Sequence, residues 1–147
     1  MRFATPMSAA LIAALFFTVA LLVVTAYFLL GSVPLLTLAH DTPMDSRFVR
    51  SFFNIYYLAA MFTAGATALS CALAGRASLA AVAAALVLVA VLMRRQIIPK
   101  MAALGAQIPV GEGPAVRAFR RTHLTAIAVN LVQLVIIVWT LIAASRP

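Results

Sequence analysis

Four long stretches without a charged residue organise the chain. They run from Ala9 to Leu30, Ser51 to Gly75, Ala77 to Met93 and Leu124 to Ser145. A helix of about 20 apolar residues crosses the roughly 30 Å hydrocarbon core of a bilayer, so each stretch is close to spanning length. A segment in lipid must satisfy its own backbone hydrogen bonds, which isolated strands cannot do. The pattern predicts an all-α, polytopic membrane protein built as an antiparallel bundle of four transmembrane helices.

The residues that flank these stretches set the expected helix ends. Thr42, Pro43 and Asp45 are typical of an N-cap, a first helical position and an acidic first turn. Gly113-Pro114 begins the fourth helix in a similar way, and the short Gly75-Arg76 connection makes the second and third helices an antiparallel pair. We expect a single membrane domain over residues 1–147, with helices at 8–38, 43–74, 77–104 and 114–145.

The composition excludes the soluble classes of protein. Of the 147 residues, 65% are hydrophobic and 10% are charged, and the mean hydropathy is +1.11. Soluble domains carry about 25% charged residues, so a cytosolic enzyme and a nucleic-acid-binding domain are both excluded. The single Cys71 lies inside an apolar stretch, which leaves no disulfide framework and no thiolate metal cluster.

The net charge of +8 comes from 11 basic and 3 acidic residues, and the basic residues are unevenly placed. Eight lie in the first and third connections, and three lie on the other side of the bundle. The eight are Arg47, Arg50, Arg94, Arg95, Lys100, Arg117, Arg120 and Arg121. The positive-inside rule places these two connections in the cytoplasm and both termini in the periplasm of a bacterial inner membrane. We expect the bilayer and its anionic lipids as partners, and no nucleic acid.

Polar residues form one stripe on the fourth helix. At about 100° per residue, His123, Asn130, Gln133 and Thr140 fall within one arc. Polar groups are costly in lipid, so this stripe is expected to face the bundle or a partner chain. The stripe is either a pocket, with His123 as proton acceptor, ligand or metal contact, or a set of hydrogen bonds that join helices and do nothing more.

The second helix offers a partner for that stripe. Asn54 is expected at a depth in the membrane similar to that of His123. This gives the hypothesis of one ligand-binding cluster that consists of Asn54, Tyr57, His123 and Asn130, with Gln133 next to it. The preferred interpretation of the pair Tyr56-Tyr57 is different, because tyrosines near a membrane interface usually belong to the aromatic belt. On the first helix, Thr18, Thr25 and Ser32 share a face, and we expect them to bond their own backbone or a neighbour.

The candidate ligands for a metal site are the loop residues His40, Asp41, Met44 and Asp45. Their spacing matches no closed zinc site, and only one of them is a histidine. The chain also lacks a Ser-His-Asp pattern, a glycine-rich phosphate loop and paired acids within the apolar stretches. We therefore expect no catalytic residue, no metal and no cofactor.

The run IIPKMAALG at 97–105, followed by FRRTHLTAIAVNLVQL at 119–134, resembles a family of small four-helix membrane proteins related to transmembrane protein 205. The matching pattern is Phe119, His123 and Asn130, with Thr125 close to the family's hydroxyl position. Pro34 and the aromatic pairs at 52–53 and 56–57 resemble the family's entry to helix two. The resemblance implies a four-helix membrane fold and no settled activity.

Pro99 and His123 also fit the order found in an anthrone-oxygenase-like four-helix family, although Phe119 stands where such proteins tend to carry a tryptophan. The predicted function is a non-enzymatic inner-membrane protein that self-associates or serves as an accessory subunit of a membrane complex. The alternative is a binder or oxidoreductase of a lipid-soluble quinone or polyketide-like molecule, with a polar cluster around His123 and Asn130.

Overall fold

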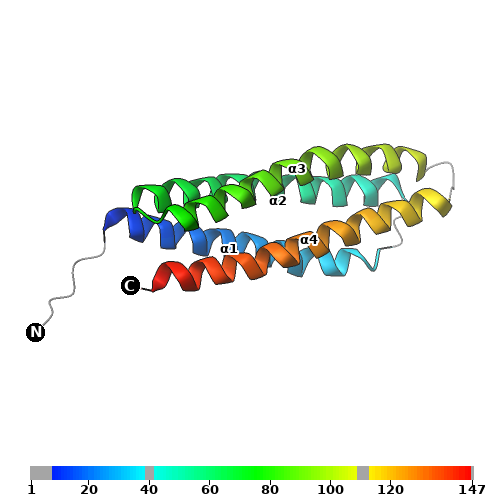
Figure 1. Ribbon diagram of the computed structural model, residues 1–147. Coiled ribbons are helices and arrows are strands. Elements are labelled where there is room, and N and C mark those ends of the chain that lie inside the picture. The colour runs from blue at the N-terminus through cyan, green and yellow to red at the C-terminus, as the bar shows by residue number, and fades with distance from the viewer. Residues whose placement is uncertain (1–7, 39–41, 109–112, 147) are drawn as a thin grey trace, which may run out of the picture.

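A computed structural model describes residues 8–38, 42–108 and 113–146. It contains four helices, α1 (Ala9–Leu35), α2 (Pro43–Leu73), α3 (Ala77–Gln107) and α4 (Gly113–Ser145), and the described residues form no strand. The helices lie side by side in an elongated bundle, with the start of α1 and the end of α4 at the same end (Figure 1). All four are long and apolar enough to cross a membrane. The predicted all-α, multi-pass four-helix bundle is confirmed.

The observed helix ends differ from the expected ones by a few residues. Helix α1 ends at Leu35 rather than at residue 38, because the N–H groups of residues 36–38 donate to carbonyls three residues back, which forms a turn after Leu35. Helix α3 continues through Pro99 to Gln107, three residues beyond the predicted end at 104. Helices α2 and α4 begin and end within one residue of the predicted positions.

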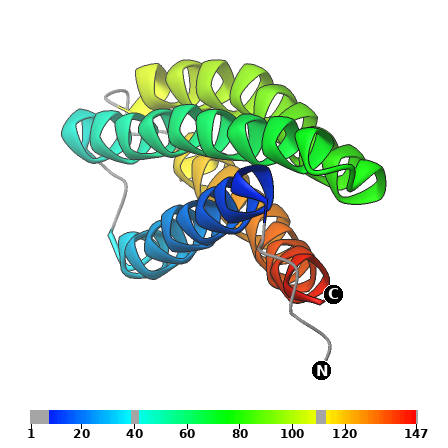
Figure 2. The ribbon, with the colours of Figure 1, turned by 90° about the vertical axis from the view of Figure 1, so that its left-hand side faces the viewer.

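Each helix packs against its neighbours in sequence, and α1 also packs against α4. Seen along the bundle, α2 and α3 form one layer, and α1 and α4 cross beneath it (Figure 2). The α2–α3 connection is a tight Schellman turn, in which Arg76 N–H donates to the Cys71 carbonyl at 2.9 Å and Gly75 N–H to the Ala72 carbonyl at 3.0 Å. Gly75 has φ of +73°, which glycine adopts without strain. The predicted antiparallel pair follows from this turn.

The predicted start of α2 is also confirmed. Thr42 is the N-cap, and its hydroxyl accepts a hydrogen bond from the Asp45 N–H at 3.2 Å. Pro43 occupies the first turn, where its missing N–H leaves no hydrogen bond unmade. Asp45 adds a negative charge near the positive end of the helix dipole. Helix α2 therefore begins before the apolar stretch that starts at Ser51, and its buried aromatic residues lie in the interior of the bundle.

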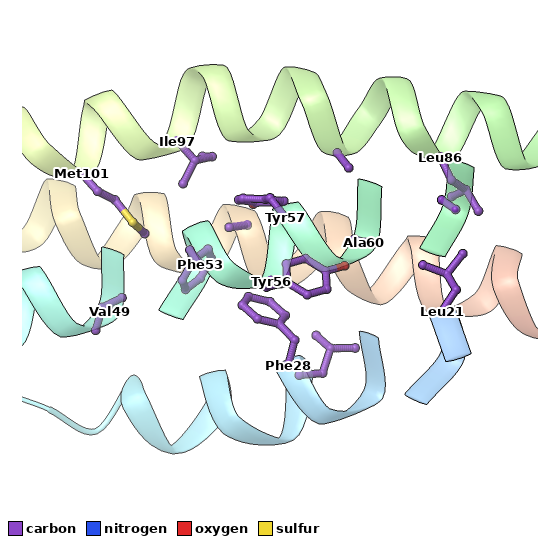
Figure 3. Close-up of a cluster of buried hydrophobic side chains, with 14 of the residues drawn as sticks. Leu21, Phe28, Val49, Phe53, Tyr56, Tyr57, Ala60, Leu86, Ile97 and Met101 are labelled. Carbon is purple, nitrogen blue, oxygen red and sulfur yellow. The ribbon is translucent and has the colours of Figure 1, made fainter. Parts of the chain in front are cut away.

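Aromatic side chains from α1 and α2 fill the middle of the core. The Phe28 ring stacks on Tyr56 with centroids 3.9 Å apart and meets the edge of Phe53 at 4.7 Å. Phe28, Phe53 and Tyr57 are all fully buried. Figure 3 shows Tyr56 and Tyr57 inside the bundle, between the ribbons of α1 and α3. Aromatic pairs of this kind contribute about 0.5–1.5 kcal/mol beyond their buried area, and here they fix the position of both tyrosine hydroxyls.

Candidate functional site

The polar stripe of α4 lies inside the bundle, as its spacing predicts. His123 and Asn130 are fully buried, Thr140 is 1% exposed and Gln133 is 6% exposed. Ala126 and Ile137, which share the arc, are buried as well. The Thr140 hydroxyl donates to the Ile136 carbonyl of its own helix at 2.8 Å. Because exposure to lipid would be costly, the other three side chains require partners within the protein or a ligand.

Tyr56 joins the stripe from α2. Its hydroxyl lies 3.1 Å from Asn130 Oδ1 and 3.3 Å from Gln133 Oε1. A phenol carries one proton, so the two carbonyl oxygens share a single donor. Helices α2 and α4 are not adjacent in the chain, and their packing is weaker than that of each neighbouring pair. The Tyr56 hydroxyl therefore ties together two helices that face each other across the bundle.

The interpretation of Tyr56-Tyr57 as part of an aromatic belt is wrong. Tyr56 is 4% exposed and Tyr57 is fully buried, so both rings lie inside the bundle and neither faces the lipid. The reason is their position on the helix. Val49, Phe53, Tyr56 and Ala60 follow one another at spacings of four, three and four residues, which places them on the same face of α2, and all four are buried. That spacing is the signal that identifies Tyr56 as a core residue.

Several buried polar atoms around Tyr56 make no hydrogen bond within the described residues. They are Thr25 Oγ1, Tyr57 Oη, Asn130 Nδ2 and Gln133 Nε2. Thr25 of α1 lies beside Tyr56, and Tyr57 lies beside Asn130. We call Thr25, Tyr56, Tyr57, Asn130 and Gln133 the central polar cluster. The two hydroxyls can donate or accept, whereas the NH₂ groups of Asn130 and Gln133 can only donate, and within the described residues neither has an acceptor.

Thr25 differs from the two hydroxyl residues that share its face of α1. The Thr18 hydroxyl donates to the Ala14 carbonyl at 2.7 Å, and the Ser32 hydroxyl donates to the Leu29 carbonyl at 3.2 Å, as expected for residues that bond their own helix. Thr25 makes no such bond although it is fully buried. Its position in the cluster has no signal in the sequence beyond the shared face.

The predicted cluster of Asn54, Tyr57, His123 and Asn130 is brought together only in part. Tyr57 and Asn130 belong to the central polar cluster. Asn54 is half-buried, and its Oδ1 accepts a hydrogen bond from Arg94 Nε of α3 at 3.0 Å. His123 is fully buried, and its ring meets the Phe53 ring edge-on with centroids 5.1 Å apart. Asn54 is thus a partner of a basic residue on α3.

Two apolar grooves on the sides of the bundle lead to the cluster. The groove between α3 and α4 has a volume of about 540 Å³, and among the described residues that line it Gln133 alone is polar. The others are Val82, Ala85, Leu86, Val89, Val129, Val132, Ile136 and Trp139. A second groove, of about 330 Å³, lies between α1 and α2 and is lined by Phe28 and Tyr56, among others. Both partners of the Tyr56–Gln133 hydrogen bond therefore border a surface groove.

The described residues contain no group of three histidine, cysteine or acidic side chains that could hold a metal ion. His40 and Asp41 of the loop set lie outside the described residues. Comparisons with protein-family models, curated proteins and solved structures found no match to this chain. The resemblance to the family of transmembrane protein 205 stays a prediction. The fold defines a multi-pass four-helix membrane protein, and the site is a polar centre within it.

Proposed function

We propose that this protein binds a lipid-soluble small molecule in the groove between α3 and α4. The observation that carries the proposal is Gln133, a buried amide whose Nε2 has no hydrogen-bond partner within the described residues and which lines an apolar groove. An amide NH₂ in such a place recognises a carbonyl or another acceptor. A quinone or a polyketide-like molecule has this chemistry, with apolar rings or chains around its oxygens.

The size and lining of the groove support this proposal. Small-molecule sites have volumes of about 300–1,000 Å³, mostly apolar walls and a few placed polar groups. The groove of about 540 Å³ has this composition. Val132 and Trp139 on its wall are 60% and 55% exposed on the outer surface, so the groove opens toward lipid. A ligand dissolved in the bilayer would enter from the side, without crossing water.

A purely structural role explains the central polar cluster less well. Polar side chains that only join helices pair donors with acceptors, and each such pair contributes about 0.6 kcal/mol on average in a membrane bundle. Here Tyr56 supplies one proton to two carbonyl oxygens, while the NH₂ groups of Asn130 and Gln133 are left over. Buried polar groups without partners are rare in proteins and call for an explanation. A ligand that accepts from Gln133 provides one.

The test uses Trp139 as a reporter, since it is the single tryptophan of the chain and lines the groove. Purified protein in lipid nanodiscs is titrated with a short-chain benzoquinone, and quenching of tryptophan fluorescence is followed. We expect saturable quenching, weakened about tenfold by Gln133→Leu, because the amide hydrogen bond is lost. Thr140→Val is the matched control, since Thr140 is a buried member of the same stripe that bonds its own helix.

Quenching that rises without saturation and is equal in the wild type and Gln133→Leu would refute the binding proposal. Native mass spectrometry of gently extracted protein gives an independent measurement. A single chain that carries a small molecule supports binding. A stable assembly of several chains without a small molecule supports the other predicted role, that of a self-associating or accessory subunit.

We also propose that the protein lies in a bacterial inner membrane, with the α1–α2 and α3–α4 connections in the cytoplasm. The support is the charge distribution, because eight of the 11 basic residues belong to the end of the bundle that carries these connections. A C-terminal fusion to alkaline phosphatase, which is active in the periplasm, should be active, whereas a fusion to green fluorescent protein should be dark. The reverse result would invert the orientation.

A further inference from the structure

A basic groove lies between α3 and the first turns of α4. It has a volume of about 450 Å³, and three cationic side chains, Lys100, Arg117 and Arg121, line it together with Ile97, Thr122 and Thr125. No acidic side chain is among the described residues that line it. Three positive charges around one concave surface produce a strong attraction for an anion.

These three side chains are available, whereas Arg94 and Arg120 at the same end of the bundle are engaged. Arg94 donates to Asn54, and Arg120 donates to the Leu38 carbonyl at 3.3 Å. Lys100, Arg117 and Arg121 are exposed and make no hydrogen bond or ion pair within the described residues. Their charges are therefore not used to hold helices together.

The depth of the groove matches the headgroup region of a bilayer. At 1.5 Å per residue, Arg121 lies about 5 Å beyond the apolar stretch that starts at Leu124, and Arg117 lies about 10 Å beyond it. Lys100 lies about 10 Å beyond Met93, where the apolar stretch of α3 ends. The headgroup layer adds about 5–8 Å to each side of the hydrocarbon core. Arg121 thus lies within the headgroup layer, and Arg117 and Lys100 lie just beyond it, where their long side chains can reach back to the lipid phosphates.

We propose that this groove binds the headgroup phosphate of an anionic phospholipid. Basic pockets between transmembrane helices at a cytoplasmic surface have this role in other proteins. A lipid fits better than a free phosphate, because the same helix pair carries apolar residues deeper in the bilayer, such as Val89 and Val129, against which an acyl chain can lie. The charged residues that hold the headgroup are distinct from Gln133, so either proposal can fail without the other.

The test compares two double variants that remove equal charge from the same end of the bundle. Arg117→Gln/Arg121→Gln removes two of the three positive charges of the groove. Arg47→Gln/Arg50→Gln removes two positive charges that line other grooves. Native mass spectrometry measures bound phosphatidylglycerol against phosphatidylcholine in mixed micelles. A basic residue beside the bound headgroup contributes about a fivefold factor in binding, so the loss of two should lower the preference of the groove variant for phosphatidylglycerol about 25-fold. The control should keep most of it.

Arg117→Lys/Arg121→Lys retains both charges and should keep binding within a fewfold, and circular dichroism checks that every variant is folded. Equal losses in both glutamine variants would overturn the proposal in favour of diffuse attraction between the bundle end and the membrane. Displacement of the lipid by millimolar inorganic phosphate would overturn it in favour of a free anion. Retention of the preference in Arg117→Gln/Arg121→Gln would also overturn it.

Discussion

Replacing Tyr56 by phenylalanine tests the hydrogen bond that crosses the bundle. The substitution keeps the ring, which stacks on Phe28 at 3.9 Å, and removes only the hydroxyl shared by Asn130 Oδ1 and Gln133 Oε1. Leaving buried acceptors without a donor costs about 1–3 kcal/mol, and measured interhelical hydrogen bonds in membranes reach about 1.7 kcal/mol. We expect Tyr56→Phe to lower the free energy of unfolding by about 1–2 kcal/mol.

The neighbouring tyrosine is the control. Tyr57 is also fully buried, but its hydroxyl makes no hydrogen bond within the described residues. Tyr57→Phe removes an unsatisfied polar group, so stability should stay equal or rise by up to about 1 kcal/mol. Reversible unfolding by sodium dodecyl sulfate in mixed micelles, followed by far-ultraviolet circular dichroism, measures both variants. A larger loss in Tyr57→Phe than in Tyr56→Phe would refute the assigned hydrogen bonds.

Substitutions at four further positions test the fold by the same unfolding assay. Gly105→Ala would place Cβ 2.8 Å from Ser46 Oγ, which already donates to the Pro43 carbonyl, so this substitution should lower the free energy of unfolding by about 1–3 kcal/mol. Gly65→Ala is the control: its Cβ would enter open space, so stability should stay equal or rise. Thr42→Ala removes the N-cap of α2 and should cost about 1 kcal/mol, and Thr42→Ser should restore most of it. Asn54→Leu leaves Arg94 without its acceptor and should lower the free energy of unfolding by about 1.5–3 kcal/mol. Quenching of Trp139 by the quinone should be unchanged, and weaker quenching would place Asn54 in the ligand site.

The sequence predicts the fold of this chain well because a physical requirement leaves few alternatives. An apolar stretch of spanning length has to be helical, and the short Gly75-Arg76 turn has to reverse the chain. The inward position of Asn130 and Gln133 follows from the same logic, since these side chains are costly in lipid. All of these features depend on local sequence alone.

The composition of the site could not be predicted to the same extent, because it depends on how each helix is rotated about its axis and on which helix each side chain contacts. Depth along the bundle suggests that Asn54 and His123 lie at one level, but depth does not tell which neighbouring helix a side chain faces, and Asn54 contacts Arg94 of α3. A tyrosine suits both a membrane interface and a core. The Tyr56 hydroxyl meets a residue 74 positions away, on the helix opposite its own. Such a contact is visible only once the bundle is assembled.

The hydrogen bond at Tyr56 and the proposed ligand site are physically coupled, because both use the amide of Gln133. A ligand that accepts from Gln133 Nε2 would polarise the amide and strengthen its carbonyl as an acceptor for Tyr56. Ligand at a hundred times its dissociation constant stabilises the folded state by about 2.7 kcal/mol. This exceeds the 1–2 kcal/mol expected to be lost in Tyr56→Phe, so saturating quinone should restore that variant to at least the stability of the unliganded wild type. The same concentration is only about ten times the dissociation constant of Gln133→Leu, so it should stabilise that variant by only about 1.4 kcal/mol. Equal stabilisation of both variants would show that the ligand does not use this amide.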